Sequence, residues 1–209
     1  MIKIIAIVAM LIDHIGVVFF PQFLIFRIIG RLAFPLFAWG IAMGYSRTKN
    51  FSKYSQRVLL LALISQPFFM LALGSDNLNI CFTLFLGLMS IHFYEKISNN
   101  YYNVLILVAI ILSPLLLGVE YGVFGVLSIL FFYIFKDNIL LLTSQSVLLF
   151  AWVAIKKSVI LHILSLPALF IICYFNKYDY KINRYFQYSF YPAHLFLIYI
   201  INMSLKYIF

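Results

Sequence analysis

Four ionisable side chains occur within a short, otherwise apolar stretch near the start of the chain. Asp13 and His14 adjoin each other in MLIDHIG, and Arg27 and Arg31 follow in RIIGRLAFP. A charge at membrane depth costs about 2.5 kcal/mol or more, so ionisable residues there usually have a function. An imidazole can act as a general base, and a guanidinium group can stabilise a developing negative charge. The residue types therefore indicate proton transfer or anion binding inside a membrane.

Two apolar runs must position these four side chains. We expect helices near residues 3–20 and 23–45, and the short Pro-Gln turn between them makes the two helices antiparallel neighbours. With a rise of about 1.5 Å per residue, His14 lies roughly 9 Å and Arg31 roughly 12 Å below the same membrane boundary. The imidazole and the guanidinium groups should therefore meet at one depth on adjacent helices.

The spacing also predicts how the charges pair. Arg27 and Arg31 are four residues apart and share a helix face. Asp13 directly precedes His14, so its side chain points about 100° away around the helix. We therefore expect Asp13 to pair with an arginine rather than to orient the imidazole. A purely structural ion pair stays open as an alternative, although two arginines and a histidine exceed what one pair needs.

Further polar residues interrupt later apolar runs. Gln66 stands before Pro67, and His194 follows Tyr-Pro-Ala in the last run. Polar groups and interrupted helices at membrane depth are tolerated where they line a cavity, so we expect these residues to line a cavity within the membrane. The remaining polar residues have simpler interpretations: Thr83 and Gln145 as interhelical hydrogen bonds, and His92 and His162 as residues near span ends.

Composition predicts the fold class. The chain has 209 residues, of which 65% are hydrophobic, 19% aromatic and 10% charged, with a mean hydropathy of +1.06. A soluble domain carries roughly 25% charged residues. We expect an all-α, polytopic transmembrane bundle. The first run contains two ionisable residues and no cleavage site follows it, so we expect a retained span rather than a signal peptide. No polar segment is long enough to fold separately, which predicts a single integral-membrane domain over 1–209.

We predict about nine spans, with eight as the alternative because two are short. With the N-terminus in the cytoplasm, ten basic residues fall in cytoplasmic loops and three outside, as the positive-inside rule expects. The predicted spans are 3–20, 23–45, 54–74, 80–96, 102–118, 121–135, 138–154, 158–175 and 186–207. The ten cytoplasmic residues are Lys3, Arg47, Lys49, Lys53, Arg57, Lys96, Lys136, Lys177, Lys181 and Arg184.

Four of these basic residues, Arg47, Lys49, Lys53 and Arg57, form a cluster that runs from the loop after the second predicted span into the start of the third. The cluster is first a topology signal, and phosphate binding is the alternative. The basic residues are spread over loops rather than gathered on one soluble face, so we expect no nucleic-acid partner. No HxxxH or HExxH spacing occurs, so we expect no metal site. Membrane lipid is the expected surrounding, and the sequence leaves the oligomeric state open.

Residues 10–16 (MLIDHIG) and 27–37 (RIIGRLAFPLF) together resemble the TraX family, and further matches follow in order, among them 64–68 (ISQPF) and 191–195 (YPAHL). The founding member of that family acetylates the N-terminal residue of conjugative pilin. The family also resembles membrane acyltransferases that use cytoplasmic acetyl-CoA to modify an acceptor at the outer face. The resemblance thus implies a multi-pass acetyltransferase of the bacterial plasma membrane, with acetyl-CoA as donor and a pilin amine or a cell-envelope glycan or lipid as acceptor.

The resemblance also implies roles for individual residues. His14 would be the catalytic base, Asp13 its neighbour, and Arg31 a group near the developing charge. The residues expected to bind donor or substrate are Arg27, Gln66, His194, Arg47, Lys49, Lys53 and Arg57.

Two other classes of function fit the same residues. A transporter or proton-coupled carrier could use Asp13, His14, Arg27 and Arg31 as an intramembrane relay or anion site. A structural membrane subunit could use the same charges to dock a partner span. The chain also has Met43 where many relatives in the family carry a glutamate, and Gln66 where some carry a carboxylate, and these departures leave the acceptor open.

Overall fold

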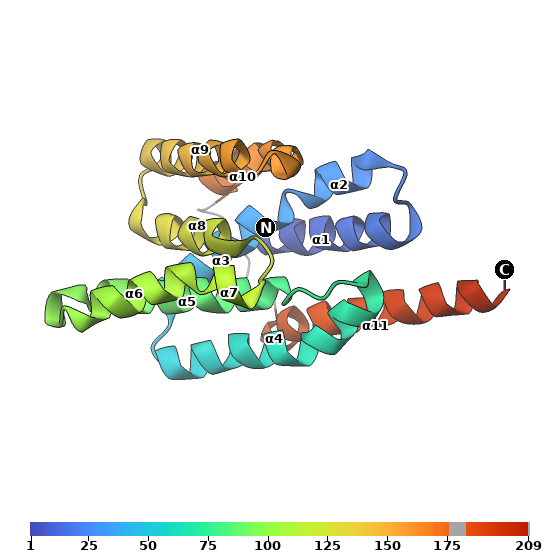
Figure 1. Ribbon diagram of the computed structural model, residues 1–209, viewed down its shortest axis with the longest axis horizontal. Coiled ribbons are helices and arrows are strands. Elements are labelled where there is room, and N and C mark those ends of the chain that lie inside the picture. Colours follow the sequence, from blue (N-terminus) through green and yellow to red (C-terminus); the bar gives the residue numbers. More distant parts are fainter. Residues whose placement is uncertain (176–182, 209) are drawn as a thin grey trace. The chain divides into compact units, whose positions relative to one another are not determined.

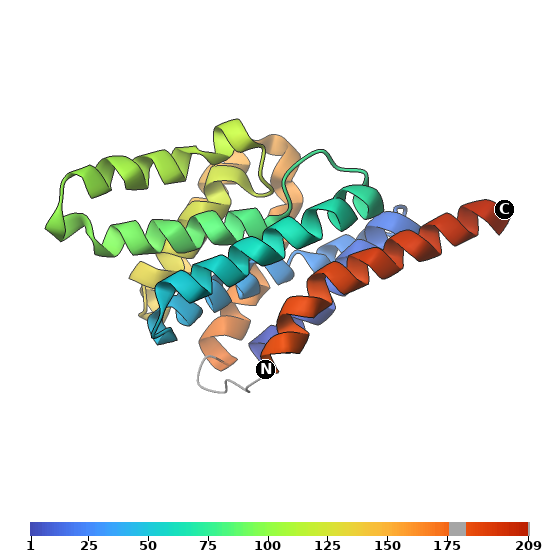
Figure 2. The same ribbon diagram turned by 90° about the horizontal axis from the view of Figure 1, so that it is seen from below.

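The computed structural model describes residues 1–175 and 183–208, and these residues form helices without a β-strand (Figures 1 and 2). An isolated parallel bridge joins Leu78 to Val119. The prediction of an all-α membrane fold is confirmed. The α-helices are α1 (Ile2–Phe19), α2 (Leu24–Gly30), α3 (Ala33–Arg47), α4 (Phe51–Leu73), α5 (Ile80–Glu95), α6 (Tyr102–Leu112), α7 (Pro114–Leu117), α8 (Gly122–Ile134), α9 (Asn138–Ile155), α10 (Leu166–Phe175) and α11 (Arg184–Ile208), and the 3₁₀ helices are Ile97–Asn99 and Lys157–Ser165.

The predicted spans match these helical segments to within three residues at either end. In the described part of the chain, four helical segments are long and apolar enough to cross a membrane: Ile2–Phe19, Leu24–Arg47, Phe51–Leu73 and Asn138–Ile155. Four further apolar helical segments of that part are shorter: Ile80–Glu95, Tyr102–Leu117, Gly122–Ile134 and Ile160–Phe175. The last helix, α11, has 25 residues but is not among the four long apolar segments. The cytoplasmic N-terminus stays a prediction. Lys177 and Lys181, which the charge count assigns to the cytoplasm, lie outside the described residues.

The second predicted span is not one continuous helix. It divides into α2 and α3 at Arg31 and Leu32, where a tightened turn brings the Leu32 N–H to the Ile29 carbonyl at 3.2 Å. Pro35 explains the break, because a proline has no N–H for the carbonyl four residues earlier and its ring crowds that carbonyl. A similar division at Ser113 and Pro114 separates α6 from α7. Pro67, by contrast, lies within α4, which continues to Leu73.

The described residues group into two compact units. The first unit comprises Met1–Leu36, Leu63–Asp76 and the described part of Leu164–Phe209. Within it, α1 packs against α2, α10 and α11 (Figure 2). The close approach of α1 to α2 depends on Gly16, since a Cβ there would stand 2.2 Å from Cβ of Phe26. That approach brings the charged residues of the two helices within reach of each other.

The second unit comprises Phe37–Ala62 and Asn77–Ile163, and α5, α6, α8 and α9 pack within it. The predicted interhelical hydrogen bond of Gln145 is confirmed. The Gln145 amide donates to the Ser128 carbonyl at 2.9 Å and accepts from the Ser128 hydroxyl at 2.8 Å, which joins α8 to α9. The Thr83 hydroxyl donates to the carbonyl of Glu120, which lies in the turn before α8. The prediction that Thr83 bonds to another helix is therefore wrong. The prediction that 1–209 form one domain stays a prediction.

Candidate functional site

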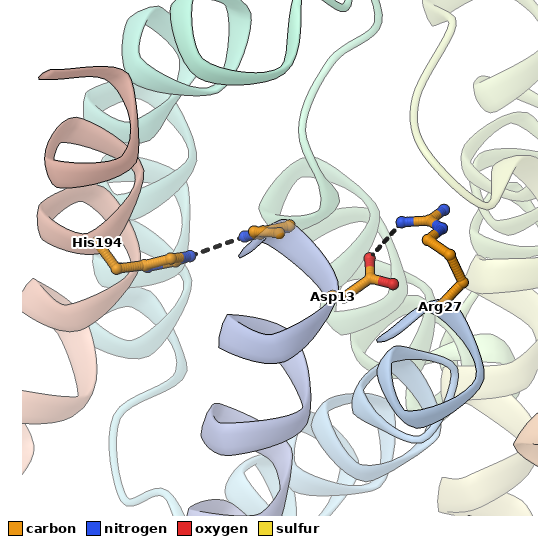
Figure 3. A network of polar contacts seen from close by, with 4 residues as sticks. Asp13, Arg27 and His194 are labelled. Carbon is orange, nitrogen blue, oxygen red and sulfur yellow. Dashed lines mark hydrogen bonds and ion pairs between the residues drawn. The ribbon is translucent and has the colours of Figure 1, made fainter. Parts of the chain in front are cut away.

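An ion pair joins the first two helices. Arg27 Nη1 donates to Asp13 Oδ2 at 2.8 Å, and the two side chains are 30% and 19% exposed (Figure 3). The pair confirms that Asp13 engages an arginine rather than its neighbour in sequence. Gly30 makes room for it, because a Cβ at that position would lie 2.0 Å from Asp13 Oδ1. The close approach of Asp13 therefore requires a residue without a side chain at position 30.

Arg31 lies one helical turn beyond Arg27, at the end of α2. Its side chain is buried, with a relative exposure of 9%. The Asp13 carboxylate lies within electrostatic reach of both guanidinium groups. One carboxylate thus faces two positive charges in an apolar part of the protein, and such an excess of positive charge suits an anionic or polarised group nearby.

The second contact of the site joins two histidines from opposite ends of the chain. Nδ1 of His14 lies 2.8 Å from Nε2 of His194, although the residues are 180 positions apart (Figure 3). Both rings are buried, with relative exposures of 9% and 5%. Nδ1 of His194 lies 2.8 Å from the carbonyl oxygen of Phe190, one turn earlier in α11. Sequence reasoning placed both histidines at membrane depth but not in contact.

The two contacts start from neighbouring residues of α1 and diverge. The Asp13 side chain turns to α2 and the His14 ring turns to α11, as their adjacent positions in a helix require. The imidazole and the carboxylate therefore have different partners. This geometry differs from a triad in which a carboxylate holds the imidazole of the base.

Gln66 belongs to the first unit and is half-buried in α4. Two residues further along α4, the ring of Phe68 contacts the ring of Phe196 in α11, with centroids 5.4 Å apart. The helix that carries Gln66 therefore contacts the helix that carries His194 through this pair of rings. Ser65, beside Gln66, is fully buried.

The predicted basic cluster belongs to the second unit. Arg47 ends α3, and Lys53 and Arg57 lie one turn apart near the start of α4. Arg47, Lys49 and Lys53 are exposed, whereas Arg57 is half-buried. The three exposed side chains are thus available to a ligand in solution, as a phosphate-binding role would require.

An aromatic group beside this cluster was not predicted. The rings of Phe51 and His92 are stacked with centroids 3.7 Å apart and planes within 5°. The Tyr45 hydroxyl lies 3.5 Å from Nδ1 of His92, and the Tyr45 ring contacts that of Tyr133 edge-on. His92 was predicted as a residue near a span end, and it is half-buried near the end of α5. Phe51 and Tyr45 come from helices other than that of His92, so no spacing in the sequence signals these contacts.

Fold and site together define an all-helical membrane protein with a buried cluster of ionisable side chains. A family model described as TraX protein matches residues 1–202, and the chain belongs to the TraX family. It is 28% identical to the probable fimbrial assembly protein FimC, serogroup H1, of Dichelobacter nodosus, over 234 aligned residues that cover 98% of this chain and 95% of that protein. It is 30% identical to the uncharacterized protein RP591 of Rickettsia prowazekii (strain Madrid E) over 105 residues, 49% of this chain and 40% of that protein. No solved structure matches.

Proposed function

We propose that the chain transfers an acetyl group from cytoplasmic acetyl-CoA to an acceptor at the outer face of the bacterial plasma membrane, with His14 as general base. Membership of the TraX family supports a role connected with pilin, because the relative from Dichelobacter is named as a probable fimbrial assembly protein. The N-terminal amine of a pilin is therefore the proposed acceptor. A cell-envelope glycan or lipid is the alternative acceptor for the same reaction.

The observation that carries this proposal is the setting of His14. Its ring is buried and one of its two nitrogens is hydrogen-bonded to a second imidazole. A neutral imidazole held in this way still has its other nitrogen for proton transfer. The buried guanidinium group of Arg31 belongs to the same unit and is a suitable partner for an oxyanion.

In the proposed step, His14 removes a proton from the acceptor amine while the amine nitrogen attacks the thioester carbonyl carbon. Arg31 stabilises the negative charge that develops on the thioester oxygen. A C–N bond forms, the C–S bond breaks, and His14 returns the proton to the departing thiolate. General-base help of this kind contributes typically about 10²–10⁴-fold to the rate. Asp13 acts through Arg27 and keeps that guanidinium group in place.

The donor needs a second set of residues. Acetyl-CoA carries phosphate groups, and exposed cations are the side chains that hold such groups. Lys49, Lys53 and Arg47 are exposed and Arg57 is half-buried, so their charges fit that requirement. We propose that these four residues bind the phosphates of coenzyme A. Gln66, in α4, is the proposed hydrogen-bonding residue for the substrate.

The test supplies labelled acetyl-CoA to membranes with and without the protein and then identifies what carries the label. Wild-type membranes should label an acceptor, and His14→Ala should lower the rate by about 10²–10⁴-fold. The matched control is His162→Ala, which removes a half-buried histidine of the second unit and should keep the rate. Equal labelling with and without the protein, or an unchanged rate in His14→Ala, would refute the proposal.

A proton-coupled carrier is the second candidate, and the partly buried Asp13–Arg27 pair favours it because transporters place such pairs on their ion pathways. The two candidates differ in their products. A carrier would move a solute or protons across liposomes without consuming acetyl-CoA, whereas a transferase would release coenzyme A in step with acceptor labelling. Flux without thioester consumption would replace the first proposal with the second.

A further inference from the structure

We propose that His194 is a positioning residue, which sets the tautomer of His14 and thereby makes Nε2 of His14 the basic nitrogen. The catalytic meaning of this assignment rests on the proposed function, but the tautomer itself can be measured without any reaction. Three features of the first unit carry the inference: a backbone carbonyl, an imidazole pair and the burial of both rings.

The first step fixes the proton on His194. A backbone carbonyl oxygen can only accept a hydrogen bond, and the Phe190 oxygen lies 2.8 Å from Nδ1 of His194. Nδ1 of His194 must therefore carry a hydrogen. Phe190 and His194 are four residues apart in α11, so the ring folds back along its own helix onto the carbonyl one turn earlier.

The second step concerns charge. If His194 were an imidazolium, both of its nitrogens would donate, and Nδ1 of His14 would have to accept. Both rings are buried, and Arg27 of the same unit is within electrostatic reach of His14. A positive charge on either ring would be removed from water and would be repelled by the Arg27 guanidinium group. The neutral form of both rings therefore has the lower free energy.

The third step follows from the first two. A neutral His194 with its hydrogen on Nδ1 has a lone pair on Nε2, and that atom lies 2.8 Å from Nδ1 of His14. The two ring planes are within 3° of parallel, and the ring centroids are 5.0 Å apart. The two bonded nitrogens are thus much closer to each other than the ring centroids are, as expected for two rings that lie in nearly one plane and meet edge to edge. In that arrangement the Nε2 lone pair of His194 points at Nδ1 of His14. Nδ1 of His14 is therefore the donor.

The consequence is a defined base. With its hydrogen on Nδ1, His14 has a lone pair on Nε2, and that nitrogen is left to accept the proton from the acceptor amine. When Nε2 is protonated, the Nδ1 hydrogen still points at the neutral imidazole of His194. That imidazole sets the tautomer and the orientation of His14, as the carboxylate of a triad does for its base. Asp13 takes no part in this, since its carboxylate binds Arg27.

The experiment is ¹⁵N NMR of the full chain in lipid nanodiscs, with ¹⁵N-histidine. The chain has four histidines, and single substitutions assign their signals. His14 and His194 should both show a protonated Nδ1 and an unprotonated Nε2. The His194→Phe variant keeps an aromatic ring but has no hydrogen-bond acceptor. In this variant the hydrogen of His14 should no longer be confined to Nδ1. A wild-type His14 with its hydrogen on Nε2, or a His14 signal unchanged in His194→Phe, would overturn the assignment.

A matched pair of variants tests the catalytic meaning. The side-chain amide of His194→Gln can reach the position of Nε2 and accept from His14, whereas that of the shorter His194→Asn reaches only the position of Nδ1. The Gln variant should keep at least tenfold more of the kcat than the Asn variant, with the KM for acetyl-CoA unchanged in both. Equal loss in the two variants would overturn the positioning role. An absence of transfer in the wild type, with the tautomers as expected, would refute the proposed function and leave the tautomer assignment standing.

Discussion

Replacing Gly30 with alanine should break the contact between α1 and α2 at the ion pair. The added methyl group would stand 2.0 Å from Asp13 Oδ1 and 2.4 Å from both Cβ and Cγ of the same residue. Real Cβ atoms do not approach this closely, so Asp13 or the helix must move. Any such movement lengthens the 2.8 Å bond from Arg27.

The size of the effect follows from three contributions. Overpacking a well-packed contact costs about 1–3 kcal/mol. Loss of the Asp13–Arg27 bond adds about 1 kcal/mol, a value reduced for partial exposure of both side chains. Alanine in place of glycine in a helix returns up to about 1 kcal/mol. Gly30→Ala should therefore lower the free energy of unfolding by about 1–3 kcal/mol.

The assay is reversible unfolding in lipid–detergent bicelles, followed by circular dichroism. Gly40→Ala is the matched control, since Gly40 lies inside α3 and an added Cβ meets nothing within 4 Å. It should be neutral or slightly stabilising. A second control repeats Gly30→Ala in an Asp13→Gly background, where the three atoms nearest the new methyl group are gone. The steric reasoning would be refuted if the Gly30→Ala protein were as stable as the Gly40→Ala protein. It would also be refuted if Gly30→Ala lowered the free energy of unfolding equally in the wild-type and Asp13→Gly backgrounds.

Two further predictions concern the second unit. Gln145→Leu removes both hydrogen bonds to Ser128 and should lower the free energy of unfolding by about 0.6–1.7 kcal/mol. The double variant with Ser128→Ala should recover part of this loss. Unfolding in bicelles measures the stability of both variants. Lys49→Glu and Lys53→Glu should each raise the KM for acetyl-CoA at least threefold with little change in kcat, as measured by steady-state release of coenzyme A. Lys136→Glu, which changes an exposed lysine beside the Tyr133 ring, serves as control, and an equal rise in its KM would argue against phosphate binding by the cluster.

Asp13 and His14 bind different partners, so substitutions at the site should have separate effects. Asp13 is adjacent to His14 in sequence, yet its carboxylate is bound by Arg27 and the imidazole by His194. Substitution of Asp13 should therefore act on helix packing and on Arg27. Substitution of His194 should act on the base itself.

The hydropathy of the sequence determined where the helices lie, because membrane depth demands long apolar runs whatever their neighbours are. The spans predicted from these runs end within three residues of the helical segments. The pairing of Asp13 with an arginine was also predictable, because the positions of side chains on one helix and a short turn to the next are local geometry.

Tertiary structure alone decided which histidine meets His14. His194 is 180 residues away, and the packing of α11 against α1 makes the contact. Hydropathy assigns a residue to a depth but not to a neighbour, and each helix can turn about its axis without changing its hydrophobic length. The same holds for His92, whose partners Phe51 and Tyr45 come from other helices. Contacts between distant helices depend on how side chains such as Gly16 and Phe26 fit together, and that fit exists only in the folded chain.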